Sequence, residues 1–234
     1  MLPLAAAAQS VMSSRQMVAV TPMLSDKVDL PPAAKSLLAQ KLGQIATQNG
    51  FGAVSGQMVL TSGVVTLDKT HTVATMVKFV VKLGVTLYVM DLAEGVVIDS
   101  YNFEVTGIDN ADHKAVLKAV SQIKSGSPGI RRFMTQARGK IIDYYTTHIP
   151  AIITKAQTLD KMGRPDEALA LLASVPDVVE HYPAVAEQMQ LIAEGMSEEG
   201  GYTTLDDSAK RMFVERMLMD ALNGWYLSNF LSVD

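Results

Sequence analysis

The sequence predicts an α+β protein with two domains: a β-α-β-β-β-α domain over residues 17–127, whose helices cover one face of its sheet, and an all-α module over residues 128–234. From Val73 to Val89 every odd position is apolar or threonine, a period of two that is typical of strands. After residue 128 they recur every three or four positions, which is typical of helices. At 234 residues and 48% hydrophobic, the chain is long and apolar enough to bury a core.

Charge and composition exclude several kinds of site. The net charge of -4 gives no positive field that would attract a polyanion, so we expect no nucleic-acid partner. The chain has no cysteine, which excludes disulfides, thiolate nucleophiles and cysteine zinc sites, and its four histidines are scattered. No apolar stretch of about eighteen residues is free of charge, so no transmembrane segment is expected. We therefore expect no catalytic centre, cofactor or metal.

The first sixteen residues allow two interpretations. Residues 1–10 form an alanine-rich, apolar stretch with an Ala-x-Ala pattern before Gln9, which is typical of the end of a secretion signal and its cleavage site. The basic start of such a signal is absent. Residues 1–16 are therefore either the remnant of a signal peptide, which predicts a periplasmic or otherwise exported protein, or the disordered N-terminus of a cytoplasmic one.

The first predicted elements are a strand and a helix. Residues 17–22 are rich in apolar and β-branched residues and end at a proline, which cannot donate to a continuing ladder. Pro31-Pro32 begins a helix that runs to about Gln48, because apolar residues recur at helical spacing and Asn49-Gly50 supplies a left-handed stop.

Three longer strands follow. The composition turns to Val, Thr, Leu, Met and Phe at residues 57–66 and again at 72–90. The second run is longer than an ordinary strand, so we expect a bend or bulge near Gly84. Residues 91–95 predict a hairpin turn whose glycine takes positive φ, and residues 96–106 return antiparallel.

A second helix closes the α+β domain. Residues 107–110 (Gly-Ile-Asp-Asn) predict its start, and it runs to about Lys124 with an apolar face of alanine, valine and isoleucine. The Ser-Gly-Ser-Pro-Gly segment at 125–129 ends the helix, so the domain closes near residue 127.

The second module is predicted to be helical throughout. The His-Ile-Pro segment at 148–150 kinks or breaks its first helix. Two helices then meet at a tight turn at Gly163, with Pro165 in a permitted first-turn position. A helix over residues 183–196 and a last helix that reaches about Leu231 complete the module.

Residues 85–107 resemble a bacterial envelope domain. The run Val-Thr-Leu-Tyr-Val-Met-Asp91, the hairpin Gly95, Ser100 on the returning strand and Gly107 before an alanine-rich helix are similar to an α/β domain of known proteins. That domain is shared by the curli-export lipoprotein, the penicillin-binding-protein activator lipoproteins and the amino-terminal part of TolB. These lipoproteins carry a lipidated N-terminal cysteine, which this sequence lacks, so the resemblance implies envelope association without a lipid anchor.

Residues 156–176 resemble a tetratricopeptide-type helical hairpin. Such a repeat has a glycine at its turn, small residues where its two helices cross closely, and a proline at its end. Here these positions are Gly163, the Glu-Ala-Leu run from Glu167, and Pro176. The sequence has no second copy at the period of about 34 residues, so the other helices are expected to cap the hairpin. Together the two resemblances imply an envelope protein that recognises or scaffolds other macromolecules, and neither brings a catalytic residue to this chain.

Two pairs of residues are candidates for partner binding. Arg131 and Arg132 lie in a concentration of positive charge at the domain junction, which could receive an acidic partner or anionic polymer; a solvated helix face is the alternative. Trp225 and Tyr226 lie on a final helix that is apolar on more than one face. That helix either packs within the helical module or docks on another chain.

These features favour a non-enzymatic bacterial envelope adaptor or assembly factor that binds protein partners. Ser121 and Lys124 match the Ser-x-x-Lys spacing of serine acyl-enzymes, but the accompanying motifs are absent, so we assign no catalytic residue. The edge strand at 17–22 or the hairpin at 72–106 would bind a partner by strand addition. Two alternatives stay open: a structural subunit of a ring or tube formed by self-association, and a hydrolase or ligand-binding enzyme.

Overall fold

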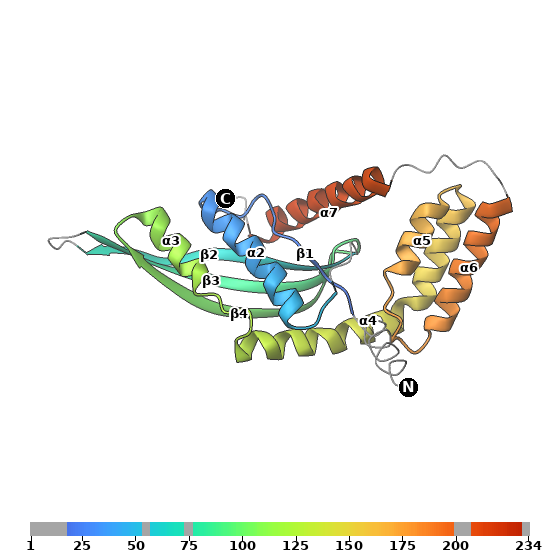
Figure 1. Ribbon diagram of the computed structural model, residues 1–234, viewed down its shortest axis with the longest axis horizontal. Helices are drawn as coiled ribbons and strands as arrows, with labels where there is room; N and C mark the ends of the chain where they lie inside the picture. The colour runs from blue at the N-terminus through green and yellow to red at the C-terminus, as the bar shows by residue number, and fades with distance from the viewer. Residues whose placement is uncertain (1–17, 53–56, 73–76, 199–206, 231–234) are drawn as a thin grey trace, which may run out of the picture. The chain divides into compact units, whose positions relative to one another are not determined.

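The computed structural model describes residues 18–52, 57–72, 77–198 and 207–230 (Figure 1). Within these residues the chain forms one four-stranded sheet and six helices, so the predicted α+β class is confirmed. The predicted signal-peptide remnant or disordered segment at residues 1–16 lies outside the described residues.

The sheet is built mainly from two hairpins. Its strands are β1 (Thr21–Pro22), β2 (Met58–Thr72), β3 (Lys78–Asp91) and β4 (Val96–Asp109), in the spatial order β1-β2-β3-β4. β1 runs parallel to β2, and the other neighbours are antiparallel. The turn between β3 and β4 follows the prediction.

Two features of the sequence make that turn. The Asp91 carboxylate accepts hydrogen bonds from the backbone N–H groups of Ala93 (3.0 Å) and Glu94 (3.1 Å). Gly95 closes the turn at φ +67°, a conformation that glycine adopts without steric cost. The register of β3 on β4 is therefore fixed by local chemistry.

The predicted strand over residues 72–90 is wrong at its start. β2 continues through Thr72, and β3 begins only at Lys78. The expected irregularity near Gly84 lies instead on β2, where the register against β3 shifts between Thr66 and Asp68. The bulge places Leu67 beside Gly84: a Cβ on that glycine would lie 3.2 Å from a methyl carbon of Leu67. The glycine therefore accommodates a neighbouring strand's bulge.

One face of the sheet is covered by α2 (Pro32–Gln48), α3 (Asp112–Ser121) and the beginning of α4 (Pro128–Lys161). α2 and α3 cross this face in Figure 1. It is built from alternate residues of β3, all buried: Val81, Leu83, Val85, Leu87 and Val89.

Gly107 permits the close approach of α3. A Cβ on this residue would overlap the backbone of Ala115 and Ala119, so only glycine fits beneath the helix. Gly107 still belongs to β4, and α3 begins at Asp112 with Ala111 as its N-cap residue. The helix therefore starts later than predicted, because the strand continues through the Gly-Ile-Asp segment.

The opposite face of the sheet is covered in part by α7 (Asp207–Phe230). Leu218 and Leu222 of this helix form a buried cluster with three residues of the sheet and its turn: Val59, Met90 and Leu92. The prediction that the last helix packs within the helical module or on another chain is therefore wrong. The sequence pattern shows that the last helix has apolar faces but does not show what they pack against. In the structure the helix is buried against the second face of the sheet.

The chain falls into two compact units that do not coincide with the predicted division at residue 127/128. The sheet unit comprises Val20–Ala137 together with the chain from Met212 onward, because both the start of α4 and α7 pack on the sheet. The helical unit comprises the chain from Arg138 through α5 (Pro165–Ala173) and α6 (Tyr182–Glu198). α4 belongs to both units.

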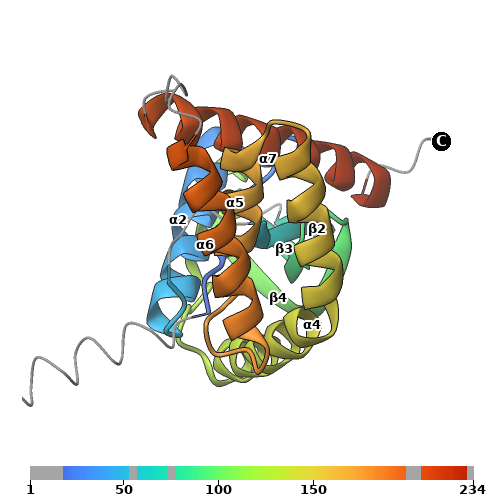
Figure 2. The same cartoon turned by 90° about the vertical axis from the view of Figure 1, so that its right-hand side faces the viewer.

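The helical unit contains the predicted tight turn. Gly163 adopts φ +72° and donates its N–H to Asp160 (2.9 Å), while Pro165 begins α5. α5 and α6 lie side by side (Figure 2) and bury residues of both helices, which include Ala168, Leu172, Val185 and Ile192. Pro150 lies inside α4, so of the two predicted outcomes at 148–150, a kink or a break, the break is wrong: the helix continues through a residue that lacks one N–H.

Candidate docking surface

The outer edge of β4 is the main exposed backbone feature of the sheet unit. β4 pairs with β3 on one side only, in a continuous register from Asp99 to Asp109. Among the described residues no backbone hydrogen bond outside the sheet ladders reaches this stretch. In an antiparallel strand alternate N–H and C=O groups point to each side, so the outer row is open to another strand.

The opposite edge is less suited to strand addition. The predicted edge strand at residues 17–22 is reduced to Thr21–Pro22, and Met17 lies outside the described residues. Beyond Leu60 the outer side of β2 carries the bulge at Leu67, followed by the charged residues Asp68 and Lys69. Bulges and charges are the features by which proteins protect sheet edges.

Aromatic rings line β4 on the face that α3 and α4 cover. Tyr101 stacks on Phe103 (centroids 5.6 Å apart) and on Phe133 of α4 (5.9 Å). The phenol of Tyr101 also lies against Gly129, where a Cβ would overlap it. Tyr101 and Phe103 are only half-buried, so a strand added to β4 would cover more of both rings.

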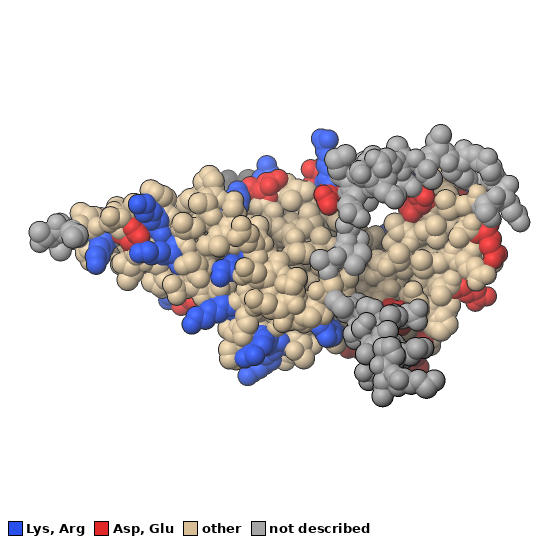
Figure 3. Space-filling model, in the orientation of Figure 1, with Lys and Arg blue, Asp and Glu red and all other residues tan. Residues whose placement is uncertain are grey.

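Basic side chains surround this edge. Lys114 of α3, Lys124 of the following turn, and Arg131 and Arg132 of α4 are all exposed, and none forms an ion pair with another described residue. Between residues 110 and 137 the sequence has five Lys or Arg and one acidic residue. Most of the charged side chains along the lower margin of the sheet unit in Figure 3 are accordingly Lys and Arg.

Four carboxylates lie on β4 or directly after it. Asp109 pairs with Lys118 of α3 (2.8 Å), Asp112 with Lys69 of β2 (2.8 Å) and Glu104 with Lys82 of β3 (2.6 Å), while Asp99 accepts the backbone N–H of Ser100 (3.0 Å). The hydrogen bond from Lys118 is the main cause that holds the pKa of Asp109 below its ordinary value; desolvation, the next largest effect, opposes it, and the Asn110 N–H and the charge of Lys114 lower the pKa further. The remaining cations keep an unbalanced positive field at this edge.

The other two predicted binding residues pack within the chain. Trp225 meets Tyr88 of β3 edge to face, with centroids 5.2 Å apart. Tyr226 is 3% exposed and stacks on Phe230 (4.6 Å), whose ring occupies the space above Gly63. Burial raises the pKa of Tyr226, and a hydrogen bond with the Val64 backbone opposes that rise. Their apolar pattern was visible in the sequence, but it serves the α7–sheet contact.

Beyond α7, the same sheet face exposes apolar side chains. Val65 (47%), Leu67 (49%) and Ile108 (49%) are about half exposed. Val65 pairs with Gly84, and Ile108 pairs with Val80, on the face that also carries Tyr88. The exposure of these residues could not be predicted from the sequence, because exposure on a strand depends on which helices cover the sheet.

The Ser-x-x-Lys spacing does not form a catalytic pair. Ser121 donates its hydroxyl to the Lys118 carbonyl (2.6 Å) and is the last residue of α3, so Lys124 lies beyond the helix. The described residues contain no group of three or more His, Asp or Glu that could hold a metal ion. Among the described residues no helix is long and apolar enough to cross a membrane.

Comparison with known proteins yields little. No family model and no curated protein matches the chain. One solved structure is similar over part of it: a crystal structure described as that of a "putative lipoprotein" from Caulobacter crescentus CB15, with 14% sequence identity and a TM-score of 0.25. The match covers 58% of this chain and 89% of that one.

Proposed function

We propose that this protein is a non-enzymatic adaptor or assembly factor of the bacterial envelope that binds a protein partner by strand addition at β4. The observation that carries the proposal is the outer edge of β4, whose register is unbroken from Asp99 to Asp109 and which pairs on one side only. Strand addition uses main-chain hydrogen bonds for affinity and side-chain contacts for specificity, and β4 offers both.

Two further features support an adaptor. The turn at Gly163 and the α5–α6 packing are compatible with a tetratricopeptide-like hairpin, which would give the helical unit its own protein contact. The resemblance of residues 85–107 to envelope domains, and the alanine-rich start of the sequence, favour export to the periplasm. The proposed role needs neither a cofactor nor a reactive side chain.

Photo-crosslinking in the native bacterium tests the proposal. The crosslinking amino acid benzoylphenylalanine replaces Thr106, which is exposed on β4, or, as a matched control, Gln40, which is exposed on α2. We expect a discrete crosslinked protein at position 106 and none of that mass at position 40. The same product at both positions, or no protein product at position 106, would contradict the adaptor.

A ring or tube subunit is the second candidate, since β2 beyond Leu60 also lacks a neighbour on its outer side. Two open edges would let copies join β4 to β2 in a continuous sheet. Light scattering on the purified protein separates the candidates: a subunit of this kind gives a mass of many chains, whereas an adaptor gives a small, fixed number.

A further inference from the structure

We infer that the β4 edge binds an extended, acidic segment of another protein, which adds to the sheet as a fifth strand between the basic side chains of α3 and α4. The inference rests on the proposed adaptor function and specifies the chemistry of the partner. Two independent observations carry it: the open strand edge, and the unpaired cations that flank it at both ends.

The backbone of β4 lacks the features that block pairing. Between Asp99 and Asp109 the strand contains no proline, no lysine and no bulge, and its one register shift against β3 precedes Asp99. Its charged residues are Asp99, Glu104 and Asp109, of which Glu104 and Asp109 are held in ion pairs with Lys82 and Lys118. By contrast, the outer side of β2 carries a bulge and adjacent charges at residues 66–69. An edge of this length without protection is suited to receive a strand.

Cations are placed near both ends of this edge. Lys118 contacts Asp109, and the charge of Lys114 reaches the same carboxylate, so the α3 lysines lie beside the last residues of β4. At the other end, Gly129 and Phe133 of α4 both contact the Tyr101 ring, which puts the helical turn of Arg131 and Arg132 beside the earlier part of β4.

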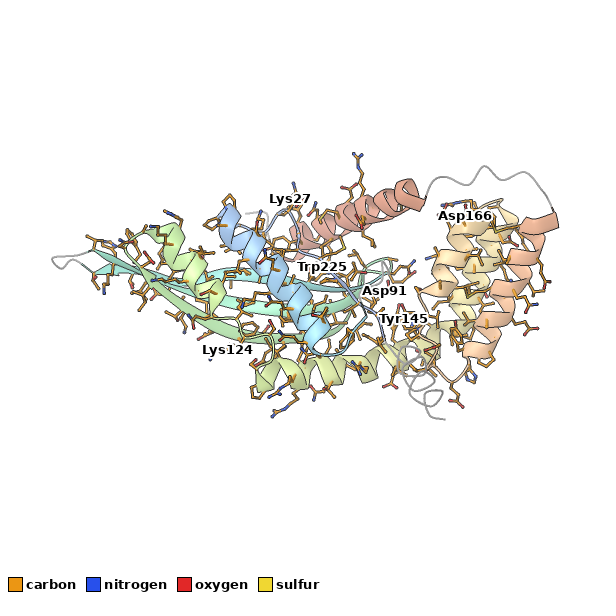
Figure 4. The ribbon with its side chains drawn as sticks, viewed as in Figure 1. Lys27, Asp91, Lys124, Tyr145, Asp166 and Trp225 are labelled. Carbon is orange, nitrogen blue, oxygen red and sulfur yellow. The ribbon has the colours of Figure 1, made fainter. Side chains whose placement is uncertain are left out.

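The turn between the two helices adds another charge. Lys124, labelled in Figure 4, lies between α3 and α4 and is exposed. A segment on β4 would thus meet positive charge near both of its ends, while its middle would lie over the half-buried Phe103 ring. The complementary segment has Asp or Glu at both ends and β-branched or apolar residues in the middle.

A synthetic peptide tests this pattern. The probe is the acetylated, amidated nonapeptide Asp-Glu-Thr-Val-Thr-Val-Thr-Glu-Asp with a fluorophore, titrated with the full chain and followed by anisotropy. The first control peptide has Lys in place of all four acidic residues. The second keeps the acidic ends but carries N-methyl groups on its three central residues, which removes the N–H donors that strand addition needs. We expect binding of the acidic probe only.

Charge reversal on the protein provides the matched comparison. Arg131→Glu with Arg132→Glu should weaken the affinity for the acidic probe by about tenfold or more, because two exposed attractive charges become repulsive. Lys27→Glu with Arg216→Glu changes the net charge of the protein equally at two exposed positions of the sheet unit, one before α2 and one on α7, and it should change affinity less than about twofold. Circular dichroism checks that both double variants stay folded.

Each other outcome overturns the inference. Equal binding of the N-methylated peptide would mean charge attraction without strand addition, and equal weakening by both double variants would mean a non-specific field. Binding of the lysine peptide, absence of probe binding, or a protein dimer through β4 that the probe does not displace would exclude the acidic segment. A protein crosslinked at position 106 would in those cases leave the adaptor proposal intact with a partner of other chemistry.

Discussion

The Asn223 side chain accepts a hydrogen bond from the Ser25 hydroxyl (2.7 Å), joining residues 198 apart in the sequence. The same oxygen also accepts the backbone N–H of Asp26 at 2.9 Å. Ser25 is fully buried, so water does not readily replace the amide oxygen as the acceptor of its hydroxyl, whereas the Asp26 N–H lies at an exposed position. This one amide fixes α7 to the segment between β1 and α2.

Asn223→Ala should lower the free energy of unfolding by about 1–2 kcal/mol, because it leaves two donors without their acceptor. Asn223→Asp retains an acceptor oxygen and should lower the free energy of unfolding by less than Asn223→Ala does. Urea unfolding followed by circular dichroism measures both. Asn229→Ala, which removes an exposed side chain of the same helix, is the control and should change stability by less than about 0.5 kcal/mol. A larger loss in the control than in Asn223→Ala would contradict the assignment.

Leu222→Ala should lower the free energy of unfolding by about 2–5 kcal/mol, because the side chain is fully buried against Val59 and Met90. Leu227→Ala, on the exposed side of α7, should cost less than about 1 kcal/mol. Removing α7 as a whole would expose the sheet residues of this cluster. Equal effects of the two leucine variants would argue against docking of α7.

Gly107→Ala should destabilise the sheet unit by about 1–3 kcal/mol, because the new methyl group meets the backbone of α3 rather than a flexible side chain. Gly43→Ala provides the contrast. This glycine lies inside α2 with no atom within 4 Å of an added Cβ, so alanine should stabilise the protein by about 0.5–1 kcal/mol. Thermal unfolding of both variants checks the opposite signs. Stabilisation by Gly107→Ala would exclude the close helix–strand contact.

Lys118→Met should raise the pKa of Asp109 toward its ordinary value of 3.8, since the ammonium's hydrogen bond is the main cause of the lowered pKa. A carboxyl whose pKa is lowered by folding contributes stability that is present above its ordinary pKa and is lost as the pH falls through the lowered one. The contribution therefore disappears in acid below about pH 4. An NMR titration of the Asp109 carboxyl carbon measures the change. Lys114→Met, which removes only a weak charge effect, should move the pKa less; the reverse order would refute the pairing.

Local chemistry explains what the sequence could predict. The helix from Pro32 to Gln48 has its proline start and its Asn-Gly stop within the sequence, and the turn after Asp91 carries its own hydrogen-bond acceptor and its glycine. Each of these signals acts over a few residues, and this helix and this turn were both found close to their expected places.

The position of α7 could not be predicted, because it depends on contacts between residues far apart in sequence. An apolar stripe shows that a helix buries one face, but Leu218 and Leu222 do not specify that Val59 and Met90 are their partners. The same limit applies to the docking surface. Arg131 and Arg132 were found from composition, whereas the exposed edge beside them follows from the order of the strands.

The sheet unit combines an early segment of the chain, Val20–Ala137, with a late one that begins at Met212, so its parts are synthesised at different times. On a ribosome, β2 and β3 are synthesised more than a hundred residues before Leu222. Until that leucine has emerged, the apolar surface around Val59 and Met90 has no cover from its own chain. The nascent polypeptide therefore stays short of its final stability until Leu222 has been synthesised, which prolongs the period in which a chaperone or a translocase that accepts unfolded chains can engage it.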